Sequence, residues 1–273
     1  MSKQFVETSH GRIAYAQSDG TGPAVLMIHG NSTCWKVFRN QLGGDIGRAY
    51  RCIAMDLPGH GASDDAIDPD RTYNMQGYAD AAIELMTTLD HERYAVLGWS
   101  LGGHIALDML TRSSALTGVM ITGSPPIGQE PGSVQEGFEG DIERGLAAIR
   151  ALTDEEIEQF AHATCGAKAP YDPFLLEAVR RCDGRSRSLM VAKLAAGIGP
   201  SQRDAAVKSP VPLAIVNGEK DPFIKNDYIA SLPYRNIWEG KVHILNGLDH
   251  APFWEAPSLF DPFLLRFLKS LED

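Results

Sequence analysis

The chain has 273 residues, 35 acidic and 25 basic side chains, and a formal net charge of −10. This length accommodates one α/β domain with a large insertion. The acidic balance argues against nucleic acid or an anionic membrane as a partner. Residues 1–7 lack the apolar core of a signal peptide, and the apolar region 94–110 holds too many polar side chains and glycines to span a membrane. We therefore expect a cytoplasmic protein.

Short apolar runs and helical periodicity alternate through the first half of the chain. Residues 4–8 and 11–17 flank a turn and predict a hairpin. Further strands are predicted at residues 24–28, 51–55, 94–97 and 118–122, and helices at residues 35–42, 74–89 and 101–110. Strands and helices in this order predict a parallel sheet covered by helices on both faces.

The pattern changes between residues 125 and 209, where no strand signal appears. Helices are predicted near residues 141–152, 154–163, 172–182 and 186–197. Thr153 and Glu156 have the spacing of a capping box. The block leaves from the carboxyl end of a strand, where α/β proteins bind ligands. This favours a cap over the site, the alternative being a packing domain without a functional role.

The sheet pattern resumes after the helical block. Strands are predicted at residues 213–217 and 241–245, a short helix at 226–232, and a closing helix at 257–271. We therefore expect a core domain of residues 1–124 and 210–273 and a helical cap of residues 125–209. The four cysteines are scattered without a C-x-x-C pair, which predicts buried free thiols at Cys34, Cys52, Cys165 and Cys182.

The pentapeptide Gly98-Trp99-Ser100-Leu101-Gly102 stands between a predicted strand and a predicted helix. In this context a G-x-S-x-G motif raises its serine on a sharp turn, at a helix N-terminus that favours developing negative charge. The alternative is a glycine-rich turn with an ordinary serine. The strand before the motif and the helix after it favour a nucleophilic Ser100.

A serine nucleophile needs a histidine base that is oriented by a carboxylate. His250 follows the last predicted strand, at the same edge of the sheet as Ser100, and we predict that it is the base. Asp221, in the loop after strand 213–217, is favoured as the acid over Glu219 and Asp249. The other histidines suit other roles: solvated His10 and His91, loop-shaping His29 and His60, His104 on the helix of Ser100, His162 in the cap, and His243 within a strand.

The oxyanion of an acyl-transfer reaction needs two backbone N–H donors. Leu101, directly after the nucleophile, and Asn31, in the loop after strand 24–28, are predicted to supply them. The side chain of Asn31 either adds a donor or shapes its loop. No cluster of metal-ligating residues is visible in the sequence, so we expect no metal and no other cofactor.

Together these features resemble the α/β-hydrolase fold family over essentially the whole chain. The resemblance rests on His29-Gly30, the loop from Asp56 to Gly61, the pentapeptide around Ser100, and the positions of Asp221 and His250. It implies a mostly parallel eight-stranded sheet with helices on both faces and an inserted helical cap. A serine nucleophile is similar to that of esterases and lactonases, whereas dehalogenases and epoxide hydrolases of this fold use an aspartate.

A narrower resemblance is to metal-free N-acyl-homoserine lactonases of the α/β-hydrolase type. The similar segments are residues 29–32, 65–71, 98–104, 121–123, 164–166, 238–241 and 250–253. The H-x-H-x-D-H cluster of metal-dependent lactonases is not found. The resemblance implies a triad of Ser100, Asp221 and His250, an oxyanion hole at Asn31 and Leu101, and substrate contacts from Asn31, Trp99 and Phe160. It departs in two places, because the similar enzyme has Glu in place of Asp221 and a lid Tyr in place of Phe160.

The expected activity is metal-independent ring opening of lactones, N-acyl-homoserine lactones foremost, by acyl transfer. The substrate, and the expected partner, is a small-molecule ester or lactone. Three alternatives remain open: a general carboxylesterase, an enol-lactonase, and a hydrolase of C–C bonds. A receptor that binds without turnover is disfavoured, because binding alone does not require Ser100, Asp221 and His250 together.

Overall fold

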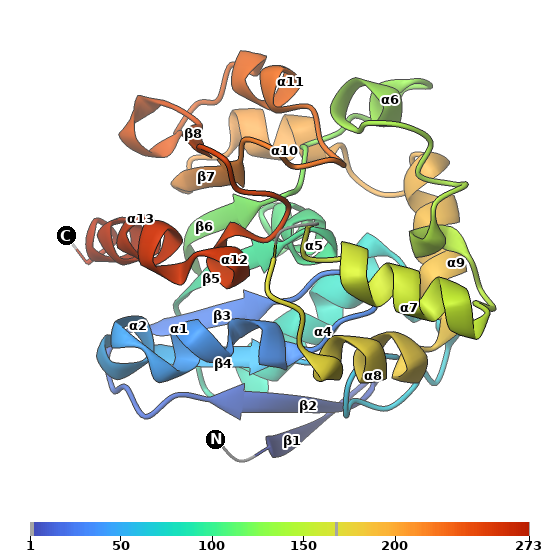
Figure 1. The fold of residues 1–273 in the computed structure, drawn as a ribbon. Coiled ribbons are helices and arrows are strands. Elements are labelled where there is room, and N and C mark those ends of the chain that lie inside the picture. Colours follow the sequence, from blue (N-terminus) through green and yellow to red (C-terminus); the bar gives the residue numbers. More distant parts are fainter. Residues whose placement is uncertain (1–2, 167–168, 273) are drawn as a thin grey trace.

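The computed structural model describes residues 3–166 and 169–272 and is built on one mixed sheet (Figure 1). The eight strands are β1 (Lys3–Thr8), β2 (Gly11–Gln17), β3 (Ala24–Ile28), β4 (Arg51–Met55), β5 (Tyr94–Trp99), β6 (Leu116–Thr122), β7 (Leu213–Gly218) and β8 (His243–Leu245). Their order is β1-β2-β4-β3-β5-β6-β7-β8. The pairs β1–β2 and β2–β4 are antiparallel and all the other pairs are parallel. The predicted fold class is therefore confirmed.

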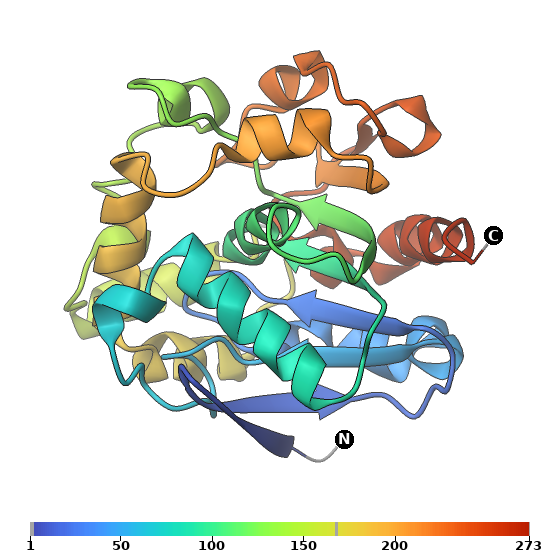
Figure 2. The ribbon, with the colours of Figure 1, turned by 180° about the vertical axis from the view of Figure 1, so that it is seen from behind.

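Helices cover both faces of the sheet. One face carries α4 (Met75–Thr88), α5 (Leu101–Met109) and α10 (Gln202–Lys208), which Figure 2 shows from behind. The other face carries α1 (Arg39–Gly43), α2 (Asp45–Ala49), α12 (Pro252–Glu255) and α13 (Pro257–Lys269). Shorter elements are η1 (Trp35–Phe38), α3 (Pro69–Thr72), α11 (Asn226–Ser231) and η3 (Trp238–Gly240).

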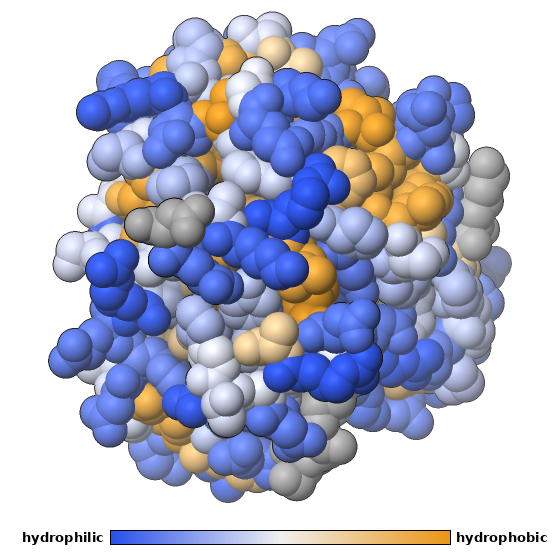
Figure 3. All heavy atoms as spheres, turned by 90° about the vertical axis from the view of Figure 1, so that its left-hand side faces the viewer, coloured by the Kyte–Doolittle hydropathy of each residue, from blue (hydrophilic) through white to orange (hydrophobic). Residues whose placement is uncertain are grey.

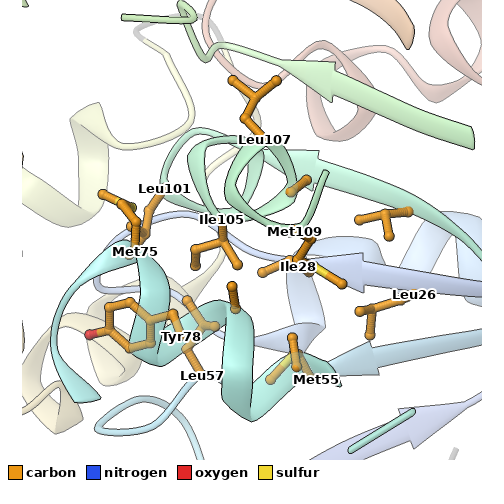
Figure 4. Packing of buried hydrophobic residues seen from close by; sticks show 14 of the residues in the cluster. Leu26, Ile28, Met55, Leu57, Met75, Tyr78, Leu101, Ile105, Leu107 and Met109 are labelled. Atoms are coloured by element: carbon orange, nitrogen blue, oxygen red, sulfur yellow. The ribbon is translucent and has the colours of Figure 1, made fainter. Parts of the chain in front are cut away.

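The two hydrophobic cores follow from the alternation of side chains along the strands. All five residues of β3 are buried, and Leu26 and Ile28 pack with α4 and α5 in the core of Figure 4. Val25 and Met27 point to the opposite core, which contains Phe260 of α13. Because successive side chains of a strand point to opposite faces, a continuous apolar run is what a strand with two covered faces requires.

The segment between β6 and β7 contributes helices and, among its described residues, no strand. It holds α6 (Ser133–Gly137), η2 (Leu146–Ala148), α7 (Asp154–Ala163), α8 (Pro173–Arg181), α9 (Gly184–Ala195) and α10. Figure 1 shows α7, α8 and α9 on the side toward which the arrowheads of β3 and β6 point. These three helices therefore lie at the edge of the sheet where parallel strands present their carboxyl ends. Residues 167–168 of this segment, like residues 1–2 and 273, lie outside the described part of the chain.

Helix α7 confirms the predicted helix 154–163, and Thr153 and Glu156 form both bonds of the predicted capping box. The predicted helix 141–152 is wrong, because only η2 is helical in that stretch. Its carbonyl groups are bound by side chains from elsewhere: Asn31 Nδ2 donates to Ala147 O (2.9 Å), and Arg187 donates to Ile149 O (2.8 Å) and Arg150 O (3.1 Å). A segment whose carbonyls bind such donors does not need a helix to satisfy its backbone.

The prediction that His10 is solvated is also wrong. His10 is buried, its Nδ1 lies 2.9 Å from Thr72 Oγ1, and burial lowers the pKa of its imidazole. His91 is half-buried. The four cysteines are buried and free, as predicted. No helix of the described residues is long and apolar enough to cross a membrane. The face in Figure 3 is mostly hydrophilic, with hydrophobic residues in separate patches.

Candidate active site

Ser100 occupies the sharp turn between β5 and α5. Its backbone has φ +53° and ψ −118°, a conformation that residues other than glycine rarely adopt. Both glycines of the pentapeptide are required by close contacts. A Cβ on Gly98 would lie 2.4 Å from Gly102 O, and a Cβ on Gly102 would lie 2.0 Å from Ile28 O. The chain therefore holds a strained serine at the N-terminus of α5, against the end of β3.

His250 and Asp221 form a buried pair in the loops after β8 and β7. His250 Nδ1 lies 2.7 Å from Asp221 Oδ2, and Asp221 Oδ1 accepts a hydrogen bond from Phe223 N–H (2.9 Å). Because a carboxylate accepts, the imidazole donates from Nδ1 and keeps the lone pair of Nε2 for another group. The ring is confined by the edge of Phe223 and by Gly123, where a Cβ would lie 2.7 Å from His250 Cε1.

The two rival acids make other contacts. Glu219 Oε2 accepts a hydrogen bond from Gly247 N–H (2.9 Å), and its Oε1 pairs with Lys220 Nζ (3.3 Å). Asp249, the residue before His250, is buried, and its backbone N–H donates to Glu255 Oε2 (2.7 Å). Asp221 is the carboxylate whose oxygen meets the imidazole of His250.

Leu101 begins α5 directly after Ser100, Asn31 lies in the loop after β3, and both line the same cavity as Ser100. Among the described residues, neither backbone N–H donates to another protein group. The side chain of Asn31 is engaged, because Nδ2 donates to Ala147 O and Oδ1 accepts from Ser32 Oγ (3.0 Å). Of the two roles foreseen for this side chain, the structure shows the one that shapes the loop, and it adds a link to the segment between β6 and β7.

A cavity of about 570 Å³ opens between the sheet edge and the helices that follow β6. Among its lining residues are Asn31, Trp99, Ser100, Leu101, Phe160 and His250. All the predicted site residues except Asp221 therefore share one cavity, and Asp221 stands behind the imidazole. No hydrogen bond joins Ser100 Oγ to His250 Nε2 within the described residues. Such contacts are often loose without substrate and tighten in the complex.

The helices after β6 supply much of the apolar lining of this cavity. Phe160 of α7 is 8% exposed and belongs to the apolar cluster of α8 and α12 as well as to the cavity wall. Trp99 is buried, and its Nε1 donates to His250 O (2.9 Å). Further apolar lining comes from Met75, Phe138, Ile142, Leu146, Met190, Val191, Leu194 and Phe223. The cavity can hold a small molecule with an apolar chain.

His104 is a cavity residue that the sequence argument set aside. It lies four residues after Ser100 on α5, and residues with this spacing share one face of a helix. Its Nδ1 lies 2.7 Å from Gln202 Oε1, and its ring stacks on Phe138 with centroids 5.5 Å apart. Burial lowers the pKa of His104 to about 4, so the ring is neutral near pH 7. The spacing from Ser100 was the signal that could have identified it.

Two other predicted histidines shape loops, as expected. His29 Nε2 accepts from Leu57 N–H (3.0 Å), and His60 Nδ1 lies 3.0 Å from Pro58 O. Among the described residues, no group of three or more His, Cys, Asp or Glu side chains is arranged to bind a metal ion. The chemistry that this site offers is that of a serine beside a carboxylate-oriented imidazole.

Comparison with known proteins places this geometry in context. A profile of the alpha/beta hydrolase family matches residues 25–261. Crystal structures of the N-acyl homoserine lactonase AidH are 45% identical to this chain. The complex with N-butanoyl homoserine covers 99% of this chain and 97% of AidH, with a TM-score of 0.95. A mutant complexed with N-hexanoyl homoserine lactone superposes with a TM-score of 0.95 as well, over 99% of this chain and 98% of that one.

Curated relatives are more distant or cover less of the chain. An uncharacterised protein of Mycobacterium tuberculosis is 39% identical over 103 residues, which span 37% of this chain and only 28% of that protein. A pimeloyl-[acyl-carrier protein] methyl ester esterase of Nitrosospira multiformis is 24% identical over 263 residues, with 93% of this chain and 98% of that protein covered.

Proposed function

The chain belongs to the alpha/beta hydrolase family, and on this basis we propose that it opens the ester bond of lactones, N-acyl-homoserine lactones foremost. One observation carries the proposal: the strained Ser100 and His250, which is paired with the buried Asp221, line one mostly apolar cavity of about 570 Å³. The 45% identity to the lactonase AidH over nearly the whole chain supports the choice of substrate. Opening such lactones destroys bacterial signals, which is quorum quenching.

In the first half of the reaction, Ser100 Oγ attacks the lactone carbonyl carbon while His250 Nε2 takes the hydroxyl proton. Asp221 holds Nδ1–H and stabilises the imidazolium that forms. The N–H groups of Leu101 and Asn31 bind the oxyanion of the tetrahedral intermediate. Each such donor lowers the barrier by about 3 kcal/mol. The strained backbone of Ser100 keeps Oγ in place for this step.

In the second half, the carbon–oxygen bond of the ring breaks and the leaving oxygen takes the proton from His250. The acyl group is then an ester of Ser100, with the new hydroxyl still tethered to it. A water molecule, deprotonated by His250, attacks this ester and releases the hydroxy acid. One lactone and one water give one hydroxy acid, which ionises and releases a proton near pH 7.

We also propose that residues 125–209 act as a cap over this site, inserted into a core of residues 1–124 and 210–273. Its helices α7 and α9 contribute Phe160, Met190 and Leu194 to the cavity wall. A cap of this kind excludes water from the acyl group and selects its length and shape. The contact between Asn31 and Ala147 supports a direct link from the cap to the oxyanion loop.

The test is turnover of a series of N-acyl-homoserine lactones by the purified chain after treatment with a chelator. Proton release and the mass of the product report ring opening, and Ser100→Ala is the matched control. We expect activity that survives chelation and a higher kcat/KM for a lactone than for a linear ester of the same acyl group. Loss of activity on chelation with recovery on adding zinc would overturn the metal-free mechanism.

A general carboxylesterase is the second candidate, because the cavity is apolar and esterases are among the relatives. A higher kcat/KM for linear esters than for lactones decides for that function. Activity on a vinylogous diketone, with none on either ester, decides for cleavage of C–C bonds. Each result is obtained with the same protein and the same Ser100→Ala control.

A further inference from the structure

His104 brings an unpaired ring nitrogen to the wall of the cavity. The residue is 4% exposed, and it lines the cavity together with Ser100 and His250. Its Nδ1 is bound to Gln202, and Nε2 forms no hydrogen bond within the described residues, yet it is not among their fully enclosed polar atoms. The small exposed part of this ring therefore faces the cavity.

The partner of Nδ1 fixes what Nε2 can do. Gln202 presents its carbonyl oxygen Oε1, which only accepts hydrogen bonds. His104 must therefore carry its proton on Nδ1, and Nε2 has a free lone pair. Burial keeps the pKa of this imidazole at about 4, so the lone pair remains free near pH 7. The stack on Phe138 holds the ring in this orientation.

The cavity that this lone pair faces is mostly apolar, although charged residues also line it. Met75, Phe138 and Leu194 line the same cavity, and within the described residues no hydrogen bond is made to Nε2. A buried acceptor without a partner costs free energy, and a ligand that brings a donor recovers it. The position calls for a ligand that carries a hydroxyl.

We propose that His104 Nε2 accepts a hydrogen bond from a hydroxyl group on the acyl chain of the substrate, which makes it a specificity-determining residue. The proposal rests on the proposed lactonase function. It names the substrate class as hydroxyacyl lactones. A keto oxygen at the same carbon can only accept hydrogen bonds, as Nε2 does. We therefore expect a 3-oxoacyl chain to be disfavoured at this position.

The distance along α5 indicates which carbon carries the hydroxyl. Four residues of helix separate His104 from Ser100, a rise of about 6 Å. In an N-acyl-homoserine lactone, five bonds lie between the reacting carbonyl carbon and the third carbon of the acyl chain, roughly 6 Å when extended. For an acyl chain that runs along α5, a 3-hydroxyl group reaches the level of His104, whereas the amide nitrogen is too close to the reacting carbon.

The test compares 3-hydroxyacyl, 3-oxoacyl and unsubstituted acyl lactones of one chain length. The readout is the ratio of their kcat/KM values. We expect the wild-type chain to favour the 3-hydroxyacyl lactone over the unsubstituted one by roughly two- to tenfold, which is what one neutral hydrogen bond provides. A ring nitrogen held in place should also distinguish the two enantiomers of the hydroxyl.

Two substitutions separate the ring nitrogens. His104→Asn keeps a polar group near the place of Nδ1, toward Gln202, and removes Nε2. His104→Gln places its terminal amide near the position of Nε2. We expect the preference to disappear in His104→Asn and to persist in part in His104→Gln. Thermal unfolding of both variants checks that they are folded, and the ratio cancels changes that affect all substrates alike.

The outcomes distinguish this proposal from the proposed function. Equal kcat/KM values for hydroxylated and plain lactones in the wild type, or an unchanged preference in His104→Asn, would overturn the role of His104 while leaving a lactonase. If the wild type opens no lactone, the proposed function fails. Linear esters of the same 3-hydroxy and plain acids then decide the role of His104 by the same ratio.

Discussion

The sheet and the helical segment 125–209 contribute different things to the site. The sheet edge supplies the proposed reactive groups, with Ser100 after β5, Asp221 after β7 and His250 after β8. The helical segment supplies apolar walls such as Phe160 and Leu194. The reactive groups are held by short contacts within the core, whereas the walls are held by packing. This division predicts that changes at the reactive groups of the core abolish the chemistry and that changes in the apolar walls of the helical segment alter selection among substrates.

The largest effect is expected at the nucleophile in the core. Ser100→Ala removes the group that forms the covalent bond, and we expect kcat to fall by about six orders of magnitude. The fold should persist, because Ala is smaller than Ser at this half-buried position. Rapid-quench measurement of the first turnover checks the result. A burst of acyl-enzyme in Ser100→Ala would show that another residue is the nucleophile.

The second largest loss of kcat is expected at the acid, Asp221. Asp221→Asn keeps the shape of the side chain but removes the carboxylate that orients His250, and kcat should fall by about four orders of magnitude. Glu219→Gln is the matched control in the same loop, with an expected change of less than tenfold. A larger loss in Glu219→Gln than in Asp221→Asn would make Glu219 the acid.

A third prediction concerns stability at the border of the two regions. His104 is neutral in the fold because burial, together with the nearby His250, lowers its pKa to about 4 from an ordinary 6.5. Between pH 4 and pH 6.5 the unfolded chain binds more protons at this residue than the folded chain does. The contribution of neutral His104 to the free energy of unfolding is therefore fully present above pH 6.5 and is lost as the pH falls toward 4. The shift corresponds to on the order of 3 kcal/mol, or roughly a hundredfold in the unfolding constant.

The comparison of wild type with His104→Phe isolates this effect. Phe does not titrate, so the variant should lose less unfolding free energy than the wild type between pH 6.5 and 4, as measured by urea unfolding. Other buried groups, such as His29 with its pKa of about 3, are common to both proteins and cancel. Parallel losses in the two proteins would contradict the buried neutral state of His104.

A fourth prediction tests the link between the regions. Arg187 of α9 is 4% exposed and donates to Ile149 O, Arg150 O and Ser32 Oγ (3.3 Å). Ser32 in turn donates to Asn31 Oδ1. Arg187 therefore acts on the oxyanion loop through Ser32 as a positioning residue. Because Arg187→Met displaces an oxyanion donor without removing it, we expect kcat to fall by about tenfold, less than the loss of a donor costs.

The control for Arg187 is the conservative variant. Arg187→Lys keeps the charge but not the fork that reaches three acceptors, so it should restore only part of kcat. A change in KM alone, with kcat unaffected, would mean that Arg187 holds the cap and does not act on the oxyanion loop. Measuring both constants with one lactone separates these roles.

The same division explains what could be predicted from the sequence. Central strands such as β3 and β5 were predictable because they are continuous apolar runs, and Ser100 because glycines flank it at fixed spacing. The form of residues 141–152 was not, because it depends on Asn31, 116 positions before Ala147, and on Arg187. His10 was misjudged for the same reason, since its partner Thr72 is 62 positions away. Patterns of neighbouring residues in the sequence do not predict contacts between residues so far apart in the chain.

The smallest effect is expected in the cap, at Phe160. The residue lines the cavity and also packs in the apolar cluster, so it either meets the substrate or only supports the wall. Phe160→Tyr adds a hydroxyl at the position where the resemblance to metal-free lactonases implies a lid Tyr. A hydrogen bond to a neutral group contributes about 0.5–1.5 kcal/mol, so kcat/KM for acyl-homoserine lactones should rise by roughly two- to tenfold.

Linear aliphatic esters are the matched control for Phe160→Tyr. They lack the amide and the ring oxygen that the new hydroxyl would bind, and their kcat/KM should not rise. Equal changes for lactones and linear esters, or a lower melting temperature without a kinetic change, would assign Phe160 to wall packing alone. A gain confined to lactones would instead show that residue 160 contacts the head group of the substrate. The core, with Ser100 and His250 unchanged, would then perform the same chemistry on lactones and linear esters.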